Sequence, residues 1–334
     1  MIRILEYGAV PAGEIFSRVE MSANVEPIVT DIIANVRANG DKAIFAYNEK
    51  FDGCVLNSLE VSEAEIQEAF DTVSPEFLDI LRTAAVNIRA FHEKQVRNSF
   101  VITQENGVVM GQKITPIERV GLYVPGGTAA YPSTVLMDSI PAKIAGCSEI
   151  VMVTPPGKTG KIHPAILAAA KIAGVTRIFK VGGAQAVAAL AYGTESIPKV
   201  DKVVGPGNAF VAEAKKQVFG VVSIDMIAGP SEILVIADGK SDPAHVAADL
   251  LSQAEHDRLA SAVLVTDSMA LAKAVSDELE KQIPLLPRAE IARASIDNNG
   301  KIIVASDLKQ VIEVSNEIAP EHLELRDGHL HPTP

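Results

Sequence analysis

Apolar residues recur at helical spacing in the first hundred residues of the chain. In the range 26–39 they fall three or four positions apart, and Gly40 follows as a stop signal. The run Ser62-Glu63-Ala64-Glu65 is a capping-box pattern, and Ser74-Pro75 puts a proline at the first position of another helix. We therefore predict three helices, the last of which ends near Gln95.

A β-hairpin is predicted over 101–114, with its turn at Glu105-Asn106-Gly107. From Val120 onward, short β-rich runs alternate with alanine-rich helical stretches. The predicted strands are 120–124, 149–154, 177–181, 202–204, 233–237, 261–266 and 301–304. The predicted helices are 134–145, 164–173, 184–192, 209–218, 242–256, 268–282 and 306–318. Such alternation, with short glycine-containing links, indicates βαβ units and a parallel sheet.

The chain has 334 residues, which exceeds what one hydrophobic core usually supports, so two domains are expected. The change in pattern near Val120 and the turn Gly229-Pro230-Ser231 bracket one compact α/β unit. The segments on either side of it can form the other domain together, which is an insertion topology. An interdomain cleft is a common place for a binding site.

Composition narrows the class of protein. The net charge is −12, whereas nucleic-acid binding needs basic patches, so we expect no nucleic-acid partner. No run approaches eighteen apolar residues and no basic amphipathic arm is present, so we expect no membrane association. The first six residues lack a signal-peptide pattern, which favours the cytoplasm.

Cys54 and Cys147 give no disulfide framework. Cys147 is either a nucleophile or, as we favour, a small packed hydrophobe.

Three strand-to-helix junctions are rich in glycine, at 124–128, 181–185 and 205–208. Each would direct backbone amides and a helix N-terminus to the carboxyl edge of the sheet, an arrangement that binds dinucleotide phosphates. None of the three has the G-x-G-x-x-G pattern, and no acidic residue stands at the usual offset for a ribose. The junctions are thus either a dinucleotide site or tight links.

Polar residues that could carry chemistry lie at and after the turn Gly229-Pro230-Ser231. If Ala244 to His256 is one helix, Gln253 and His256 share a face and offer two donors to a metal such as zinc, which needs three or four ligands. Glu321 and His322 are adjacent groups that can transfer protons, or else part of an exposed polar loop. Ser231 either caps a turn or contacts a polar substrate.

Over about 26–326 the chain closely resembles the histidinol dehydrogenase family. The most specific stretches are Gly121-Leu-Tyr-Val-Pro-Gly-Gly, Gly182-Gly-Ala-Gln-Ala, Val204-Gly-Pro-Gly-Asn-Ala-Phe-Val, Asp225 to Glu232, Asp249-Leu-Leu-Ser-Gln-Ala-Glu-His and Ala319-Pro-Glu-His-Leu-Glu. The family oxidises L-histidinol to L-histidine through an aldehyde in two NAD-dependent steps. Its fold is two Rossmann-like domains with terminal extensions, assembled as an intertwined homodimer.

The resemblance implies a role for each matching residue. Tyr123, Gln185 and Asn208 match NAD-binding positions. Gln253 and His256 match zinc ligands that also contact substrate, Ser231 and His322 match substrate contacts, and Glu321 and His322 match the catalytic acid-base pair. The implied mechanism uses His322 to accept the hydroxyl proton and Glu321 to activate water, while zinc holds the substrate. It needs no thiol.

From pattern and resemblance together we expect an α/β protein with two Rossmann-like, parallel-sheet domains, one inserted into the other. The assigned ranges are 1–20 for a helical N-terminal arm, 21–122 with 232–326 for the larger domain, 123–231 for the inserted NAD-binding domain and 327–334 for an unstructured tail.

The family's sequences continue beyond the Glu321-His322 pair, and two further zinc ligands, an Asp and a His, lie there, with a substrate-contacting Glu. Asp327, His329 and His331 do not match those positions by motif. We therefore expect low zinc affinity and impaired activity in this chain. Two alternatives remain open: a related dehydrogenase of another small alcohol, such as a sulfonated diol, and a non-catalytic remnant that binds a nucleotide or a partner chain.

Overall fold

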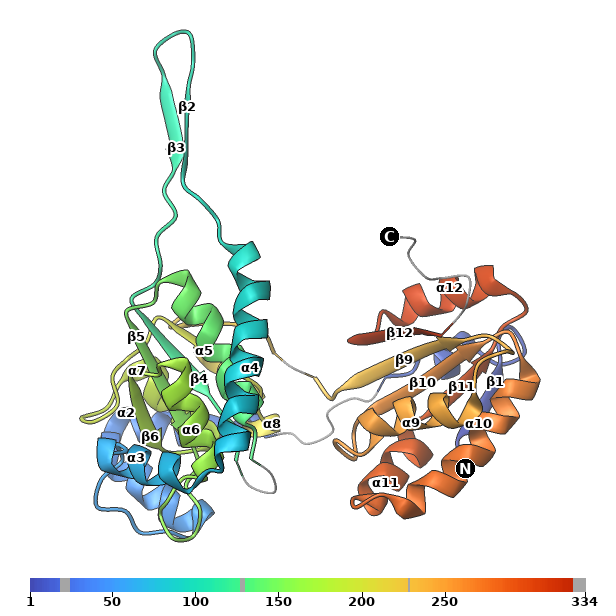
Figure 1. The fold of residues 1–334 in the computed structure, drawn as a ribbon, viewed down its shortest axis with the longest axis horizontal. Helices are drawn as coiled ribbons and strands as arrows, with labels where there is room; N and C mark the ends of the chain where they lie inside the picture. The colour runs from blue at the N-terminus through green and yellow to red at the C-terminus, as the bar shows by residue number, and fades with distance from the viewer. Residues whose placement is uncertain (19–24, 127–129, 228, 327–334) are drawn as a thin grey trace. The chain divides into compact units, whose positions relative to one another are not determined.

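The computed structural model describes residues 1–18, 25–126, 130–227 and 229–326. The chain divides into two compact units, one formed by Met1–Ser22 with Gly229–Pro334 and the other by Ala23–Ala228. Each contains a five-stranded sheet in which all neighbouring strands run parallel (Figure 1). The α/β class and the insertion of one Rossmann-like unit into the other are therefore as predicted. The expected tail, 327–334, lies outside the described residues.

The sheet of the inserted unit has the strand order β6-β5-β4-β7-β8. Its strands are β4 (Arg119–Tyr123), β5 (Glu149–Thr154), β6 (Arg177–Lys180), β7 (Lys202–Val204) and β8 (Ser223–Ile224). Helices α3 (Glu63–Thr72), α4 (Pro75–His92), α5 (Pro132–Ala145) and α6 (Pro164–Ala173) form a core with one face of this sheet. Helices α2 (Glu26–Tyr47), α7 (Gly183–Tyr192) and α8 (Ala209–Val218) form a core with the other.

The boundary between the units differs from the expected one. We grouped 21–122 with 232–326, but α2, α3 and α4 belong to the inserted unit. The reason is that the β-rich run beginning at Arg119 needs a cover on both faces, and part of that cover comes from the helices that precede it. Val29 and Ile32 of α2, for example, are buried in one core with the alanine-rich helix α7, whose small side chains permit close packing.

The sheet of the other unit has the order β1-β11-β10-β9-β12. Its strands are β1 (Arg3–Glu6), β9 (Glu232–Ala237), β10 (Ser261–Thr266), β11 (Lys301–Val304) and β12 (His322–Arg326). Helices α9 (Pro243–Ala254), α10 (Met269–Gln282) and α11 (Ala289–Asn299) share one core with the sheet. Helices α1 (Ala12–Ile15) and α12 (Leu308–Ile318) contribute to the core on the other face.

The first residues correct the prediction of a helical arm. Arg3–Glu6 form the edge strand β1, in which Leu5 pairs with Ile303 of β11, and among the described residues 1–18 only the four of α1 are helical. Ile2 and Leu5 are buried in the cores on opposite faces of the sheet, which secures the strand.

The predicted hairpin is present as β2 (Phe100–Thr103) and β3 (Val109–Gln112), paired antiparallel. It extends from the inserted unit as a two-stranded ribbon (Figure 1). All eight strand residues are exposed, and they include Phe100, Val101, Ile102, Val109 and Met110. The hairpin thus displays apolar side chains to solvent over its whole length.

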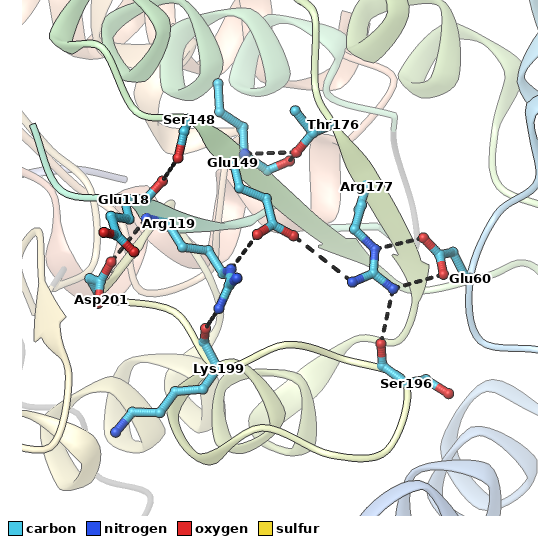
Figure 2. Close-up of polar contacts among 11 residues, drawn as sticks. Glu60, Glu118, Arg119, Ser148, Glu149, Thr176, Arg177, Ser196, Lys199 and Asp201 are labelled. Atoms are coloured by element: carbon cyan, nitrogen blue, oxygen red, sulfur yellow. Dashed lines mark hydrogen bonds and ion pairs between the residues drawn. The ribbon is translucent and has the colours of Figure 1, made fainter.

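Charged residues tie together the strands at the amino edge of the inserted sheet (Figure 2). Arg119 at the start of β4 donates to Glu149 at the start of β5 across 2.5 Å. Arg177 at the start of β6 donates to both carboxylate oxygens of Glu60, at 2.7 and 2.9 Å, and its guanidinium also lies 3.9 Å from Glu149. The fork-shaped contact with Arg177 lowers the pKa of Glu60. This edge is built for stability, whereas the opposite, carboxyl edge is hollowed.

Candidate functional site

The carboxyl edge of the inserted sheet holds a cavity of about 700 Å³, here called the edge cavity. Segments that follow β4, β5 and β6, the first residues of α7 and α8, and residues of and after α2 surround it. The lining residues are Ile28, Ile32, Phe51, Asp52, Tyr123, Gly126, Pro155, Pro156, Gly157, Lys158, Gly182, Gly183, Ala184, Gln185, Asn208 and Phe210. The three glycine-rich junctions that we singled out in the sequence therefore meet at one cavity, where open sheets of this class bind ligands.

Tyr123 lies at the end of β4 and is only 4% exposed. Its phenol oxygen accepts a hydrogen bond of 3.0 Å from the backbone N–H of Gly183, in the first turn of α7. Burial raises the pKa of Tyr123 to about 12, so the phenol stays neutral at physiological pH. A phenol can donate and accept at the same time, so the contact with Gly183 leaves its proton available for a ligand.

Gln185 and Asn208 contribute amide groups to the same cavity. Gln185 is 2% exposed and belongs to the first turn of α7. Asn208 is the N-cap of α8, where its Oδ1 accepts from the backbone N–H groups of Phe210 and Val211 at 3.1 and 3.2 Å. Because the cap occupies Oδ1, the amide nitrogen of Asn208 is the atom that can serve a ligand.

Asp52 is a lining residue that sequence reasoning missed. It closes a π-helical turn, η1 (Asn48–Asp52), and burial raises the pKa of its carboxyl to about 6. In the sequence Asp52-Gly53 gives only a turn signal, and it lies about seventy residues before the nearest glycine-rich junction. A π-helical turn next to a cavity is a recurrent feature of functional sites and is the one local signal that points here.

The other unit gathers the predicted catalytic residues at the amino edge of its sheet. Strands β9 and β12 run parallel, and His322 at the start of β12 pairs with Ile233. The Nδ1 atom of His322 lies 3.1 Å from the carbonyl oxygen of Glu232 and 3.6 Å from Oε2 of Glu321, which accepts from the backbone N–H of Glu232 at 3.2 Å. Glu321 and His322 are therefore neighbours and both are exposed.

The carbonyl contact sets the tautomer of the His322 imidazole. A carbonyl oxygen only accepts, so Nδ1 is the donor of this contact, and in the neutral imidazole Nε2 therefore keeps its lone pair. The lone pair of an exposed Nε2 is what a general base needs. The segment is thus not an irregular loop, because His322 begins a strand and its backbone register is fixed by β9.

Gln253 and His256 lie at the same amino edge of the sheet, at the end of helix α9 and just beyond it. Helix α9 follows β9 and returns to the start of β10, so its C-terminal end lies at the amino edge of the strands. Ser231 precedes β9 at this edge, and its carbonyl accepts from Ser261 N at 3.0 Å. The predicted helix to His256 is wrong in one respect: α9 ends at Ala254, and His256 lies in the following turn, where its backbone N–H donates to Gln253 O at 3.1 Å.

The donor set at this edge is too small for zinc. Gln253 is half-buried and His256 is exposed, and an amide oxygen and an imidazole are suitable ligands. Zinc takes at least three protein ligands, however, and no group of three or more His, Cys, Asp or Glu side chains that could hold a metal occurs among the described residues.

The burial of both cysteines favours a packing role over a catalytic one. Cys54 and Cys147 are both buried, and burial raises the pKa of each thiol. A nucleophilic cysteine needs the opposite shift, toward the thiolate. In the described ranges, no helix combines the length and apolar character needed to cross a bilayer.

Two parallel-sheet α/β units, a cavity at the carboxyl edge of one and a neighbouring carboxylate and imidazole on the other are typical of an α/β enzyme. Residues 17–331 match the family model described as histidinol dehydrogenase. The chain belongs to the histidinol dehydrogenase family, which is a family of oxidoreductases.

Named relatives and a solved structure agree with this assignment. A histidinol dehydrogenase of Streptococcus mutans is 58% identical over 302 residues, 90% of this chain and 70% of that protein. One of Clostridium acetobutylicum is 52% identical over 330 residues, 97% of this chain and 77% of that protein. The crystal structure of histidinol dehydrogenase from Elizabethkingia anophelis superposes with a TM-score of 0.92 at 40% identity, covering 98% of this chain and 76% of that chain.

Proposed function

We propose that this chain carries the NAD-dependent oxidation of L-histidinol to L-histidine through L-histidinal, the last step of histidine biosynthesis. Family membership supports the substrate. The observation that carries the proposal is the edge cavity, because Tyr123, Gln185 and Asn208, the positions expected to bind NAD, all line it.

The edge cavity has the chemistry that a dinucleotide needs. Its volume of about 700 Å³ is within the usual range for ligand pockets. The first residues of α7 and α8 line it, so the positive ends of two helix dipoles lie at its wall, which suits a pyrophosphate. Tyr123, Gln185 and Asn208 add a phenol and two amides for the uncharged parts of the ligand.

The residues of the other unit supply the proton transfers. When bound, NAD accepts a hydride in each of the two oxidations. In the first, Nε2 of His322 accepts the hydroxyl proton of the substrate as the carbinol C–H bond breaks. Glu321 then accepts a proton from water as the oxygen of that water attacks the aldehyde carbon, and His322 returns the proton it took to the former carbonyl oxygen, giving a gem-diol. In the second oxidation His322 accepts a hydroxyl proton of the gem-diol as the second hydride leaves for a second NAD, which yields the carboxylic acid.

We propose Ser231, Gln253, His256 and His322 as substrate contacts. A hydroxyl, an amide and two imidazoles suit the amino and imidazole groups of histidinol, and all four residues belong to the amino edge of one sheet. Zinc remains the cofactor expected from the resemblance, with Gln253 and His256 as two of its ligands, but no step above depends on it. A cytoplasmic location likewise stays a prediction.

We also propose that the protein forms a homodimer and that the β2–β3 hairpin contributes to its interface. Isolated two-stranded hairpins are marginally stable in water, and this one exposes apolar residues on both strands. A second copy of the chain that covers these side chains would stabilise the dimer by about 25 cal/mol for each Å² of apolar surface buried.

The proposed activity is tested by following NADH formation at 340 nm with L-histidinol and, in parallel, with other amino alcohols and a sulfonated diol. We expect turnover with histidinol at an impaired rate, and a further loss of 100-fold or more in kcat for His322→Ala, since general-base catalysis contributes about 10²–10⁴-fold. NAD affinity, measured by calorimetry, should be the same in both proteins. Turnover of the diol but not of histidinol, or NAD binding without turnover in the unsubstituted chain, would contradict the proposal.

A further inference from the structure

Asp52 has a fixed position on the wall of the edge cavity. The π-helical turn that carries it is anchored by Asn48, which is fully buried and whose Nδ2 donates to the carbonyl oxygen of Lys180 at 2.7 Å. Lys180 is the last residue of β6. Gly53 then takes a left-handed conformation, with φ of 66°, and its N–H donates to Asn48 O. The turn is thereby held against the carboxyl end of the sheet.

The carboxylate of Asp52 is not satisfied by the protein. Its Oδ2 atom is buried and has no hydrogen-bond partner among the described residues. Buried polar atoms are almost always paired, since desolvation of an unpaired one costs free energy, so this exception, in a side chain that lines the edge cavity, needs an explanation. Burial also raises the pKa of Asp52 to about 6, which leaves it mostly ionised at neutral pH.

The groups around Asp52 do not supply the missing donor. Lys180 forms an ion pair with Glu65, which engages its ammonium group. Tyr123 on β4 and Cys54 beyond the turn lie near enough for the Asp52 charge to add to the effect of burial in raising the pKa of both, but neither forms a hydrogen bond with Oδ2 in the described part of the chain. Lys158, from the loop after β5, lines the same cavity, but it forms no ion pair with Asp52 in the described part of the chain.

We propose that Asp52 accepts hydrogen bonds from the 2′- and 3′-hydroxyls of the adenosine ribose and thereby selects NAD over NADP. This inference rests on the NAD site proposed above. A carboxylate is an acceptor only, and its two oxygens match the spacing of a vicinal diol. Dinucleotide sites commonly use an acidic residue for this purpose, placed at a characteristic distance after the glycine-rich junction. Here the acid comes instead from a turn that precedes the sheet in sequence.

The same carboxylate disfavours NADP. The 2′-phosphate of NADP carries between one and two negative charges at pH 7, and it would replace a donor hydroxyl with an acceptor next to an ionised, partly buried acid. Like charges at hydrogen-bonding distance in a partly desolvated site repel strongly. Asp52 therefore strengthens NAD binding through the ribose diol and weakens NADP binding by repelling the 2′-phosphate.

The test compares NAD, 2′-deoxyadenosine NAD and NADP binding by calorimetry in the unsubstituted chain, Asp52→Asn and Glu49→Gln. Glu49 is an exposed acid on the same turn and does not line the cavity, so its substitution is a matched control for charge. We expect NAD to bind the unsubstituted chain at least 10-fold more tightly than its 2′-deoxy analogue or NADP. In Asp52→Asn both ratios should fall by at least 10-fold, and Glu49→Gln should leave them unchanged.

A pH series gives a second readout. It uses the unsubstituted chain and so does not depend on whether a variant folds. The NAD affinity of the unsubstituted chain should fall as pH is lowered from 7.5 to 5, because protonation of Asp52 removes one acceptor, and it should be flat in Asp52→Asn. The 2′-deoxy analogue keeps only the 3′-hydroxyl, so its dependence should be weaker in the unsubstituted chain and absent in Asp52→Asn. Failure of the unsubstituted chain to bind NAD overturns the NAD site and this assignment together. Tight NAD binding with unchanged ratios in Asp52→Asn, or equal affinity for NAD and its 2′-deoxy analogue, overturns the role of Asp52 alone.

Discussion

The hydroxyl of Tyr123 accepts from the backbone N–H of Gly183 at 3.0 Å and so joins the end of β4 to the first turn of α7. The first N–H groups of a helix have no partner within the helix, and Tyr123 satisfies one of them. The same contact orients the phenol on the wall of the edge cavity. One hydrogen bond thus supports both the fold and the proposed nucleotide site.

Tyr123→Phe should separate these two contributions. We expect a loss of about 1 kcal/mol in the free energy of unfolding, because a partly buried N–H loses its partner, and a several-fold loss of NAD affinity. Denaturant titration and calorimetry measure the two effects. Tyr192→Phe is the control, since the ring of Tyr192 packs under Arg37 away from the cavity and keeps that contact. Unchanged NAD affinity in Tyr123→Phe would remove the phenol from the proposed site.

Glu321→Gln should change the stoichiometry of the reaction. The glutamine keeps an oxygen that can accept from Glu232 N, but it cannot take a proton from water. We expect the first oxidation to survive and the second to be slowed by about 10²–10⁴-fold. Single-turnover experiments with excess NAD should therefore yield one NADH per histidinol instead of two, with aldehyde trapped by a hydrazine. Two NADH per substrate at an undiminished rate would rule out Glu321 as the base for water.

Local signals in the sequence were sufficient for most of the fold. Ser62 and Glu65 form the reciprocal capping box that their spacing indicates, and Gly40 breaks the helical geometry within α2 at φ of 51°. The helices 164–173 and 209–218 have the predicted bounds. These features depend on contacts between residues close in sequence, which is why a pattern can report them.

Features that depend on distant contacts were missed. Strand β12 exists because His322–Arg326 pairs with β9, some ninety residues earlier, and β1 exists because it pairs with β11. Asp52 reaches the edge cavity only through the Asn48 contact with β6. His256 lies beyond the end of α9, since the chain must turn there to enter β10. In each case tertiary pairing overrides a local pattern that is weak or ambiguous.

Asp138→Asn should make the protein less sensitive to pH. Burial, reinforced by the nearby charge of Asp225, raises the pKa of Asp138 in α5 to about 7, although Lys215 opposes the shift. Its Oδ2 atom is buried without a partner in the described residues. Between about pH 4 and 7 the folded state therefore holds a proton that the unfolded state has lost, so stability falls as pH rises through this window.

At pH 8 the substitution removes the cost of an ionised buried carboxyl, and we expect a gain of about 1–3 kcal/mol in the free energy of unfolding. At pH 4 Asp138 is protonated in the folded state, so the gain should vanish. Urea titrations at both pH values give the comparison, with Asp71→Asn as an exposed control. An equal effect at both pH values would contradict the assigned protonation.

Substitutions in the β2–β3 hairpin should weaken self-association without affecting the rest of the inserted unit. Val101 and Val109 are 71% and 63% exposed, and the hairpin lies outside the hydrophobic cores of the inserted unit. We expect Val101→Glu with Val109→Glu to shift sedimentation at low micromolar concentration from dimer to monomer, while the NAD affinity stays within twofold. Glu105→Gln in the hairpin turn is the control. A dimer that withstands the double substitution would remove the hairpin from the interface.

Zinc should bind this chain weakly. Gln253 and His256 are two donors where a structural zinc site has four, and complete sites in small peptides provide about 10–16 kcal/mol. About half of that free energy corresponds to a Kd on the order of micromolar or weaker. Calorimetric titration at pH 7.5 should show such binding, reduced further by His256→Ala but not by His245→Ala, which removes an exposed imidazole from the same helix region. Stoichiometric nanomolar binding that is lost in His256→Ala would mean that residues other than those described complete the ligand set.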